Sequence, residues 1–280
     1  MKLRWRLTAI AVTLLVTAAI VTLAAVFTYR HTPGPPASTR PPTTLAAEFT
    51  QLENNLHAKM GIAVSAVAND QAPIMLGDWQ EGPAWSTVKV PLVIAAYRQA
   101  NPPRVTDVMR AAITESDNAA AESLWAQLGD PATAAQKVQQ VLQETGDPTI
   151  VESRKLRPEF TAFGQTIWSL VNQIRFTAGA FCNRANDPIF NLMGQVEPDR
   201  TWGIGGIPGA EFKGGWGPSP AGKYLVRQIG VLSTPAGKIA VAIAAEPVSG
   251  SFDDGTHDLG EVAKWLTDHF GALPAGRCGR

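Results

Sequence analysis

The amino-acid sequence predicts an α+β fold, in which an antiparallel sheet is built from N- and C-terminal segments, flanked by helices, with an all-helical insertion lobe. Short apolar, β-rich stretches occupy residues 61–67 and the few residues ending at Leu76-Gly77, and two more occupy 224–232 and 238–245. Between them, from about 88 to 180, apolar residues recur at helical spacing. Strands at both ends of a chain with helices between them imply one sheet assembled from distant segments.

The composition is that of a globular chain with one apolar segment. Hydrophobic residues make up 45% and charged residues 17% of the 280 positions, and 24 Lys and Arg balance 24 Asp and Glu. Because the net charge is zero, no long-range field favours nucleic acid as a partner. The sequence has no complete G-x-G-x-x-G or G-K-S/T loop and no cysteine or histidine at zinc-ligand spacing. It therefore implies neither a nucleotide cofactor nor a metal.

Residues 1–30 form a predicted N-terminal signal anchor. Lys2, Arg4 and Arg6 precede an uncharged run from Leu7 to Phe27. A run of about 20 apolar residues matches the thickness of a bilayer, and the basic residues keep the N-terminus cytoplasmic. We therefore expect a single-pass membrane protein with its domain on the extracytoplasmic side. Cleavage at the small residues 24–25 is the alternative, which would make the segment a signal peptide and the protein secreted.

Residues 31–44 are a Pro-rich linker, and residues 45–280 form the predicted folded domain. A helix is expected from Leu45 to Met60, ahead of the first hairpin, and an amphipathic helix over 258–270 closes the domain. Within the lobe, apolar spacing predicts helices at 105–113, 119–128 and 132–144 and one carrying Phe163, Ile167, Leu170, Val171 and Ile174 on one face.

Ser86-Thr87-Val88-Lys89 is the only S-x-x-K sequence in the chain. If Ser86 opens a helix, the i, i+3 spacing brings the lysine amine beside the serine hydroxyl. A serine attacks well only after a base removes its proton, and a lysine with a lowered pKa can be that base. Taken alone, the sequence is more simply explained as a helix N-cap followed by a solvated lysine.

Two further short sequences lie in suggestive places. Ser116-Asp117-Asn118 separates two helical stretches, where these residue types also suit a helix cap. Lys213-Gly214-Gly215 precedes the last hairpin, where missing side chains would let a ligand backbone pair with a strand edge. A plain glycine-rich turn is the alternative there.

The three sequences together, in this order and setting, resemble the signature S-x-x-K, S-D-N, K-T-G of the penicillin-binding protein and serine β-lactamase superfamily. The resemblance covers residues 45–270 and implies a β-lactamase/D,D-peptidase-like serine hydrolase domain. It implies that Ser86 forms the acyl-enzyme and that Lys89 accepts its proton. Ser116 would then relay a proton to the leaving nitrogen, and Asn118 would bind Lys89 and the substrate amide.

The resemblance also assigns substrate-binding groups. Lys213, with Gly214 and Gly215 beside it, would attract the substrate carboxylate and help to keep Lys89 neutral, because two cations in one cleft disfavour each other's charge. The backbone N–H groups of Ser86 and Trp216 would form the oxyanion hole.

This chain departs from the family pattern in two informative ways. Gly214 replaces the usual Thr or Ser, so one hydroxyl contact to a substrate carboxylate is missing. No E-x-x-L-N segment, which carries the deacylating glutamate of class A β-lactamases, is present. Glu152 and Glu159 lie in about the right region and are candidate bases, with ordinary solvated loop charges as the alternative.

Three functions follow as hypotheses. The first is an exported acyl-serine enzyme that attacks β-lactam or D-Ala-D-Ala-like amides, its partner being a small-molecule or peptide substrate. The second is a true class A-like β-lactamase with efficient deacylation, and the third is a non-catalytic envelope binding protein with the same fold. In an oxidising compartment Cys182 and Cys278 would form one disulfide, the alternative being two free thiols. The sequence makes no prediction of oligomeric state.

Overall fold

The computed structural model describes residues 43–68 and 71–279. The predicted signal anchor at 1–30 and most of the linker at 31–44 lie outside the described residues. Thr43 and Thr44, placed in the linker by the sequence analysis, already belong to the first described helix, α2 (Thr43–Leu56). Within the described ranges, no helix is both long and apolar enough to cross a membrane.

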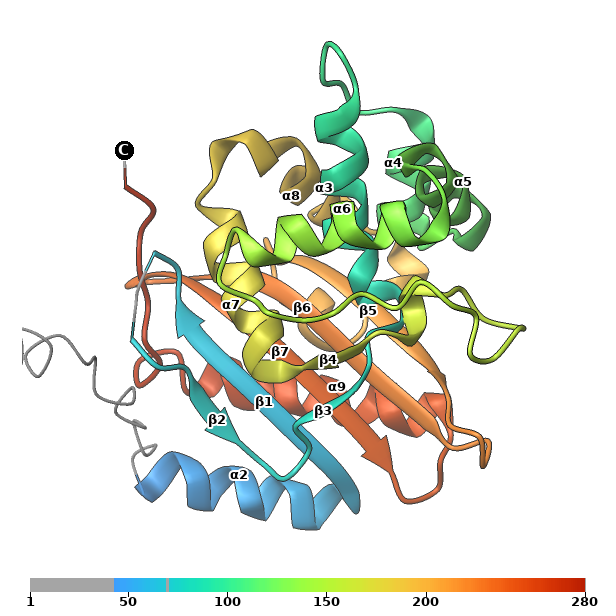
Figure 1. Ribbon diagram of the computed structural model, residues 1–280. Helices are drawn as coiled ribbons and strands as arrows, with labels where there is room; N and C mark the ends of the chain where they lie inside the picture. Colours follow the sequence, from blue (N-terminus) through green and yellow to red (C-terminus); the bar gives the residue numbers. More distant parts are fainter. Residues whose placement is uncertain (1–42, 69–70, 280) are drawn as a thin grey trace, which may run out of the picture. The chain divides into compact units, whose positions relative to one another are not determined.

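A five-stranded antiparallel sheet forms the centre of the domain, in the order β2-β1-β7-β6-β5 (Figure 1). The strands are β1 (Ala58–Ala66), β2 (Ile74–Leu76), β5 (Glu211–Pro218), β6 (Tyr224–Thr234) and β7 (Gly237–Pro247). The register between β1 and β7 runs from Ala58 opposite Pro247 to Ala66 opposite Ile239. The sheet therefore joins the first and last parts of the domain, which confirms the predicted fold class.

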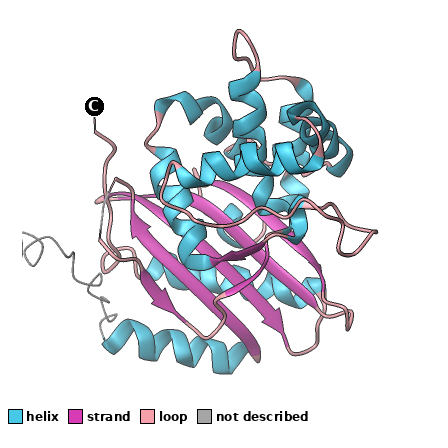
Figure 2. Ribbon diagram, in the orientation of Figure 1, coloured by secondary structure: helices cyan, strands magenta, loops and turns pink. Residues whose placement is uncertain are grey.

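Helices cover both faces of the sheet (Figure 2). On one face lie α2 and α9 (Phe252–Asp268). On the other lie α7 (Leu170–Phe181) and the lobe, which contains α3 (Lys89–Gln99), α4 (Asp107–Arg110), α5 (Asn118–Leu128), α6 (Pro131–Gln143) and α8 (Asp187–Met193). The insertion lobe of the prediction is thus present on the face that also carries the three sequence motifs.

The period-2 alternation of β7 explains how one strand serves two cores. Ala240, Ala242 and Ala244 face the core beneath α7 and the lobe, whereas Val241 and Ile243 face the core beneath α2 and α9. The small alanine side chains let α7 pack directly on the sheet. All five side chains are fully buried, so a register shift of one residue would exchange the two sets.

Three predicted helix boundaries were wrong: the end of the first helix, the start of the helix before Cys182 and the start of the closing helix. The first helix ends at Leu56 rather than Met60, because His57 adopts a φ of 54° and β1 begins at Ala58. The predicted helix through Phe163 and Ile167 begins only at Leu170, where the side chain of Ser169 caps it by accepting from the Asn172 N–H.

Phe163 and Ile167 instead belong to a short 3-10 turn, Phe163–Gln165, and to β4 (Ile167–Ser169). β4 pairs with β3 (Glu81–Pro83) in a second, two-stranded sheet that the sequence analysis did not anticipate. These strands were missed because a strand of three residues has too few alternating positions to be distinguished from helix periodicity.

The closing helix also starts earlier than predicted, at Phe252, with Ser251 as its cap.

A disulfide joins Cys182, the residue after α7, to Cys278. The segment before Cys278 is also held by the backbone, since Gly276 and Lys238 on β7 exchange two N–H to C=O hydrogen bonds. The bond closes a loop with a sequence separation of 96 residues. Cross-linking a loop of this length restricts the unfolded chain and typically contributes about 2–4 kcal/mol to stability.

Candidate active site

The turn that carries Ser86 connects β3 to α3. It is a 3-10 turn, Trp85–Val88, that continues directly into the helix, so Ser86 lies one turn before Lys89 as the sequence analysis expected. Trp85 adopts a φ of 48°, a left-handed conformation that bulky residues rarely take. Backbone strain of this kind persists only where the surroundings enforce it, and it is common at functional sites.

Lys89 is only 1% exposed and points at the Ser116-Asp117-Asn118 segment. Its Nζ donates to the backbone oxygen of Ser116 at 2.5 Å and to Oδ1 of Asn118 at 2.8 Å. A neutral amine has two N–H groups and one lone pair. With both N–H groups used on these two oxygens, the lone pair is left to accept a proton.

Ser116 stands at the end of a single π-helical turn, Ala111–Glu115, in the left-handed conformation with φ 56° and ψ 30°. Single π-helical turns are frequent at functional sites. Asp117 then caps α5 by accepting from the Ala120 N–H at 2.6 Å, so this carboxylate fixes its own loop, as the sequence analysis expected. The strained turn and the cap together present the side chains of Ser116 and Asn118 to Lys89.

Lys213, on β5, reaches the same serine from the opposite side. Its Nζ donates to Ser116 Oγ at 2.7 Å and to the backbone oxygen of Gly214 at 3.0 Å, and the side chain is 2% exposed. Lys89 Nζ is 3.4 Å from the same Oγ. Residues from three segments more than 25 positions apart therefore meet at one hydroxyl.

Burial lowers the pKa of both lysines. The pKa of Lys89 falls to about 7, mainly because the charged form is desolvated, while Asp117 opposes the shift and Arg200 adds to it. The pKa of Lys213 also falls well below its usual range, first through burial and then through the charges of Lys89 and Arg200. Desolvation is therefore the main cause of both lowered pKa values, and the repulsion between the two lysines, which the sequence analysis expected to help to keep Lys89 neutral, contributes to the lowered pKa of Lys213. Arg200, which the sequence analysis missed, is a further cation that acts on both lysines.

The glycines of β5 allow the strand to lie against the nucleophile turn. A Cβ on Gly215 would lie 2.8 Å from the Ser86 nitrogen, and one on Gly217 would lie 2.6 Å from the Trp85 ring. A Cβ on Gly214 would lie 2.9 Å from the ring of Trp202, which occupies the space of the side chain usual in the family. The sequence analysis assigned Gly214 and Gly215 to substrate binding, and in the structure their missing side chains also leave room for the Trp202 ring and the nucleophile turn.

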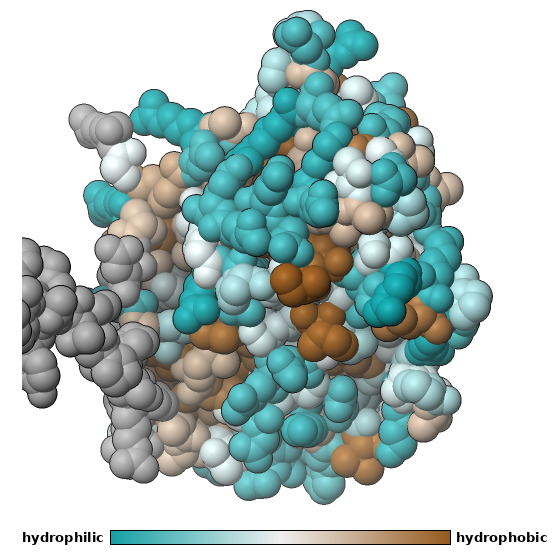
Figure 3. All heavy atoms as spheres, viewed as in Figure 1, coloured by the Kyte–Doolittle hydropathy of each residue, from teal (hydrophilic) through white to brown (hydrophobic). Residues whose placement is uncertain are grey.

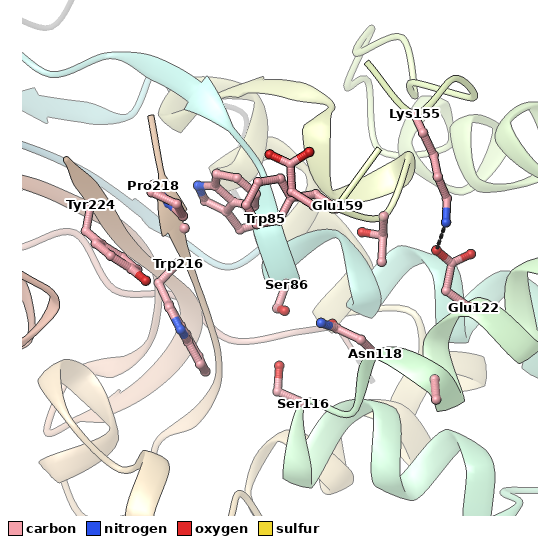
Figure 4. Close-up of a pocket in the computed structure, with 14 residues that line it drawn as sticks. Trp85, Ser86, Ser116, Asn118, Glu122, Lys155, Glu159, Trp216, Pro218 and Tyr224 are labelled. Atoms are coloured by element: carbon pink, nitrogen blue, oxygen red, sulfur yellow. Dashed lines mark ion pairs between the residues drawn. The ribbon is translucent and has the colours of Figure 1, made fainter. Parts of the chain in front are cut away.

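A pocket of about 400 Å³ opens beside Ser86 and Ser116. Ser86, Ser116, Asn118 and Trp216 line it, and Figure 4 shows Ser86, Ser116 and the amide nitrogen of Asn118 facing one another. Further lining residues that sequence reasoning missed are Trp85, Ala119, Glu122, Lys155, Phe160, Thr161, Gly217, Pro218 and Tyr224. None of these belongs to a short motif, so only the fold could bring them to the site.

The two candidate bases differ in position. Glu159 lines the pocket, but its carboxylate pairs with Arg157 at 3.1 Å and Figure 4 shows it directed away from Ser86. Glu152 does not line the pocket and pairs with Arg154, which holds the pKa of that carboxyl below its usual range. Glu122, one helical turn after Asn118, lines the pocket and pairs with Lys155 at 3.1 Å.

A buried cation supports the nucleophile turn from behind. Arg227 on β6 is fully buried and donates to the backbone oxygens of Gly82, Pro83 and Trp168 at 2.9 Å. It also donates to the side-chain oxygen of Gln173, whose amide donates to Thr87 Oγ1 at 2.9 Å. Burial lowers the pKa of Arg227 to about 9. This network holds both the strand leading to Ser86 and the residue following it.

Comparisons with known proteins agree with this architecture. No family model and no curated protein matches the sequence. Among solved structures, the chain is similar to TLA-3 extended-spectrum β-lactamase, with a TM-score of 0.65 and 17% identity over 81% of this chain and 98% of that one.

Two other structures show the same likeness. The class A β-lactamase from Mycobacterium abscessus gives a TM-score of 0.62 and 15% identity over 81% of this chain and 99% of that one. A PBP-A variant, solved as an acyl-enzyme complex with penicillin G, gives 0.63 and 21% over 85% of this chain and 100% of that one. The described domain therefore has the fold of the penicillin-binding protein and serine β-lactamase superfamily.

Proposed function

We propose that this chain is an exported acyl-serine hydrolase that attacks β-lactam or D-alanyl-D-alanine-like amides through Ser86. One observation carries the proposal: Lys89 and Lys213 both contact Ser116 in a pocket that opens onto Ser86. A buried pair of lysines at one serine has no structural need, because desolvating two cations is costly. Their presence fits a site that moves protons and binds an anion.

Acylation begins at Ser86. Its Oγ attacks the amide carbon while Lys89 Nζ accepts the hydroxyl proton, and the pKa of about 7 leaves much of this lysine neutral at neutral pH. The negative charge that develops on the amide oxygen would be stabilised by the backbone N–H groups of Ser86 and Trp216, which lie on the nucleophile turn and on β5.

Collapse of the intermediate breaks the C–N bond and requires a proton on the leaving nitrogen. Ser116 is suited to deliver it, because its Oγ accepts from Lys213 and so has its own hydrogen available for the substrate. The proton that Lys89 took from Ser86 then replaces the one lost by Ser116. The products are the Ser86 ester and a free amine.

The substrate carboxylate is assigned to the cationic side of the pocket. Lys213 is already bonded to Ser116, and the positive charge of Arg200 is close enough to lower the pKa of both lysines. Gly214 offers no hydroxyl because Trp202 fills that position, so the carboxylate is assigned to the positive charges of Lys213 and Arg200. We expect a penicillin or a peptide with a free C-terminal carboxylate to be preferred over a neutral amide.

Hydrolysis of the ester needs an activated water, and the pocket carboxylates are poorly disposed for that step. Glu159 and Glu122 are held in ion pairs, and Figure 4 shows neither carboxylate directed at Ser86. A slow second step favours a penicillin-binding enzyme over an efficient β-lactamase. The β-lactamase hypothesis is kept because Glu159 lines the pocket. The inert binding protein is disfavoured by the intact set of polar side chains.

The test is the intact mass of residues 43–280 over time after incubation with penicillin G. We expect one stable adduct on the wild-type domain, none on Ser86→Ala and a normal adduct on Ser123→Ala, which changes an exposed serine of α5 outside the pocket. The Ser86 variant should keep the wild-type melting temperature. An adduct that persists on that variant would refute the nucleophile, and rapid multiple turnover would favour the β-lactamase.

Export and membrane attachment are part of the same proposal. They rest on the predicted anchor at 1–30 and on the Cys182–Cys278 disulfide, which suits an oxidising compartment. Protease added to bacterial spheroplasts that express the full chain should digest the domain while a cytoplasmic marker stays intact. Protection of the domain until the membrane is lysed would contradict an outward-facing location.

A further inference from the structure

A second cavity adjoins the catalytic pocket and is larger, about 570 Å³. It lies between residues 156–157, β4 and the neighbouring ends of β1, β5, β6 and β7. The two cavities share Trp85, Gly217, Pro218 and Tyr224 in their linings. We call this second cavity the apolar groove. Because it shares walls with the pocket that holds Ser86, a molecule bound there could also reach the catalytic serine.

The groove displays large apolar side chains to solvent. Among the described residues, four large hydrophobic side chains are strongly exposed, and three of them line the groove: Leu156 at 58%, Ile167 at 55% and Val248 at 69%. Figure 3 shows hydrophobic atoms gathered near the centre of the face, over β4. Single exposed apolar residues are ordinary, but several around one cavity mark a binding site. The fourth, Ile150, does not line the groove and serves as a control.

The rim of the groove is cationic. Lys59, Lys223 and Arg157 line it against one carboxylate, that of Glu246. Neither Lys59 nor Lys223 forms an ion pair within the part of the chain that the structure describes. The Lys223 ammonium donates to the Val248 backbone oxygen at 3.5 Å and so lies over the apolar side of the groove. An apolar floor beside two ammonium groups that lack a carboxylate partner in this part of the chain suits a ligand with an apolar chain and an anionic group.

The strand register shows how far the groove extends across the sheet. Gly217 on β5 is opposite Leu225 on β6, Val226 is opposite Ala245 on β7, and Glu246 is opposite Lys59 on β1. The groove therefore crosses four strands, from the strand of the catalytic pocket to Lys59. Three strand spacings make this about 14 Å, which exceeds the reach of a small amide substituent.

Trp85 marks the boundary between the two cavities. Its side chain is part of both linings, the residue is 7% exposed, and its indole N–H has no acceptor among the described residues. Figure 4 shows the indole nitrogen directed toward Pro218, which also lines both cavities. A buried donor without an acceptor is costly, so a polar atom of a bound ligand at this boundary would be stabilised there.

We propose that the apolar groove binds the acyl arm of the substrate that Ser86 attacks, an elongated apolar chain that ends in a carboxylate near Lys59. This inference rests on the proposed function and names the substrate class of the same site. Three observations on separate residues converge on it: the exposed apolar floor, the two lysines without an ion pair among the described residues, and the lining shared with the catalytic pocket.

The test uses three penicillins that differ only in the N-acyl group: acetyl, octanoyl and azelaoyl, the last a chain of similar length ending in a carboxylate. Binding to the Ser86→Ala domain is measured by calorimetry, so the result does not depend on catalysis. We expect octanoyl to bind at least about tenfold more tightly than acetyl, since each buried methylene favours binding, and azelaoyl to bind more tightly again.

Variants then identify which residues give the tighter binding of the longer penicillins. Val248→Glu and Ile167→Glu, each in the Ser86→Ala background, should bring the octanoyl to acetyl ratio close to one, whereas Ile150→Glu should keep it. Lys59→Glu should remove only the advantage of azelaoyl over octanoyl, and Lys264→Glu on α9 should keep that advantage. The groove assignment would be overturned if the three penicillins bound equally to the Ser86→Ala domain. It would also be overturned if the octanoyl to acetyl affinity ratio were undiminished in both Val248→Glu and Ile167→Glu.

The rate of acylation separates this inference from the proposed function. In the domain with Ser86 intact, adduct formation with the acetyl compound tests the chemistry alone. If that compound forms no adduct while the Ser86→Ala domain binds octanoyl more tightly than acetyl, the proposed function fails and the groove stands as a binding site. If the acetyl compound acylates but the chain length changes neither rate nor affinity, the groove inference fails and the hydrolase stands.

Discussion

The floor and the mouth of the catalytic pocket are built in opposite ways. On the floor, Lys89 and Lys213 are 1% and 2% exposed and are tied to Ser116 and Asn118 by short hydrogen bonds. At the mouth, the side chains of Glu159 and Lys155 are 57% and 52% exposed and make ion pairs with Arg157 and Glu122. Buried groups in low dielectric interact strongly, whereas exposed pairs are worth about 0–1 kcal/mol.

This difference separates the two halves of the proposed reaction. The groups that acylate Ser86 lie on α3, on the strained turn before α5 and on β5, where packing fixes them. The carboxylates that would have to activate water for deacylation lie on a loop or at the open side of α5. A rigid floor with a loosely held mouth fits fast acylation and slow release.

The largest effect should follow from Lys89→Ala. Removing the proton acceptor should slow penicillin acylation at neutral pH by about 10³-fold, within the range of general-base contributions, while Lys264→Ala on α9 leaves the rate unchanged. The measurement is adduct formation against time by intact mass. A fall of less than about fivefold would mean that another group takes the Ser86 proton, which would weaken the assigned role of the floor.

The pH profile sharpens the same assignment. The pKa of Lys89 is lowered to about 7, so its neutral, proton-accepting form dominates above that pH and declines below it. The wild-type acylation rate should therefore drop about tenfold for each pH unit below 7 and level off above 7. Lys89→Ala should lose this dependence. A wild-type rate that is flat from pH 5 to 8 would contradict a lysine base with this pKa.

The next largest effect tests what holds the floor in place. Arg227→Met removes the donor for three backbone oxygens and for the Gln173 side chain. Leaving several buried acceptors unpaired should lower the free energy of unfolding by about 3 kcal/mol, even though the buried cation itself is costly. Denaturant unfolding checks this. A loss below about 1 kcal/mol would show that Arg227 is replaceable by apolar packing.

The floor could be predicted from the sequence because its chemistry is concentrated in three short segments. Ser86 and Lys89 are one turn apart, so local geometry already brings this pair together, and Ser116 and Asn118 belong to one three-residue segment. The α+β class followed in the same way from strand and helix periodicity. What the segments did not reveal is the cause of the lowered pKa of Lys89, because burial depends on the whole fold.

The mouth and the supporting network could not be predicted. Arg227 and Gln173 are 54 positions apart, and neither stands in a recognisable pattern. Gly214 looked like a lost hydroxyl contact, but only the position of Trp202 explains why a side chain is absent there. The β3–β4 pairing was missed because each strand has three residues, too few to show alternation.

The smallest expected effect is at the mouth. Glu159→Gln removes the pocket carboxylate that the sequence analysis named as a candidate base, yet this group is paired with Arg157 and directed away from Ser86 in Figure 4. The lifetime of the penicillin adduct should therefore change by no more than about twofold, as expected for an exposed ion pair. Glu152→Gln, outside the pocket, is the matched control, and adduct decay is followed by intact mass. If the adduct of the wild-type domain decays within seconds and that of Glu159→Gln accumulates while the control behaves as wild type, then the mouth supplies the base after all. The difference between floor and mouth would then be one of exposure alone, and β-lactamase would be the better description of the activity.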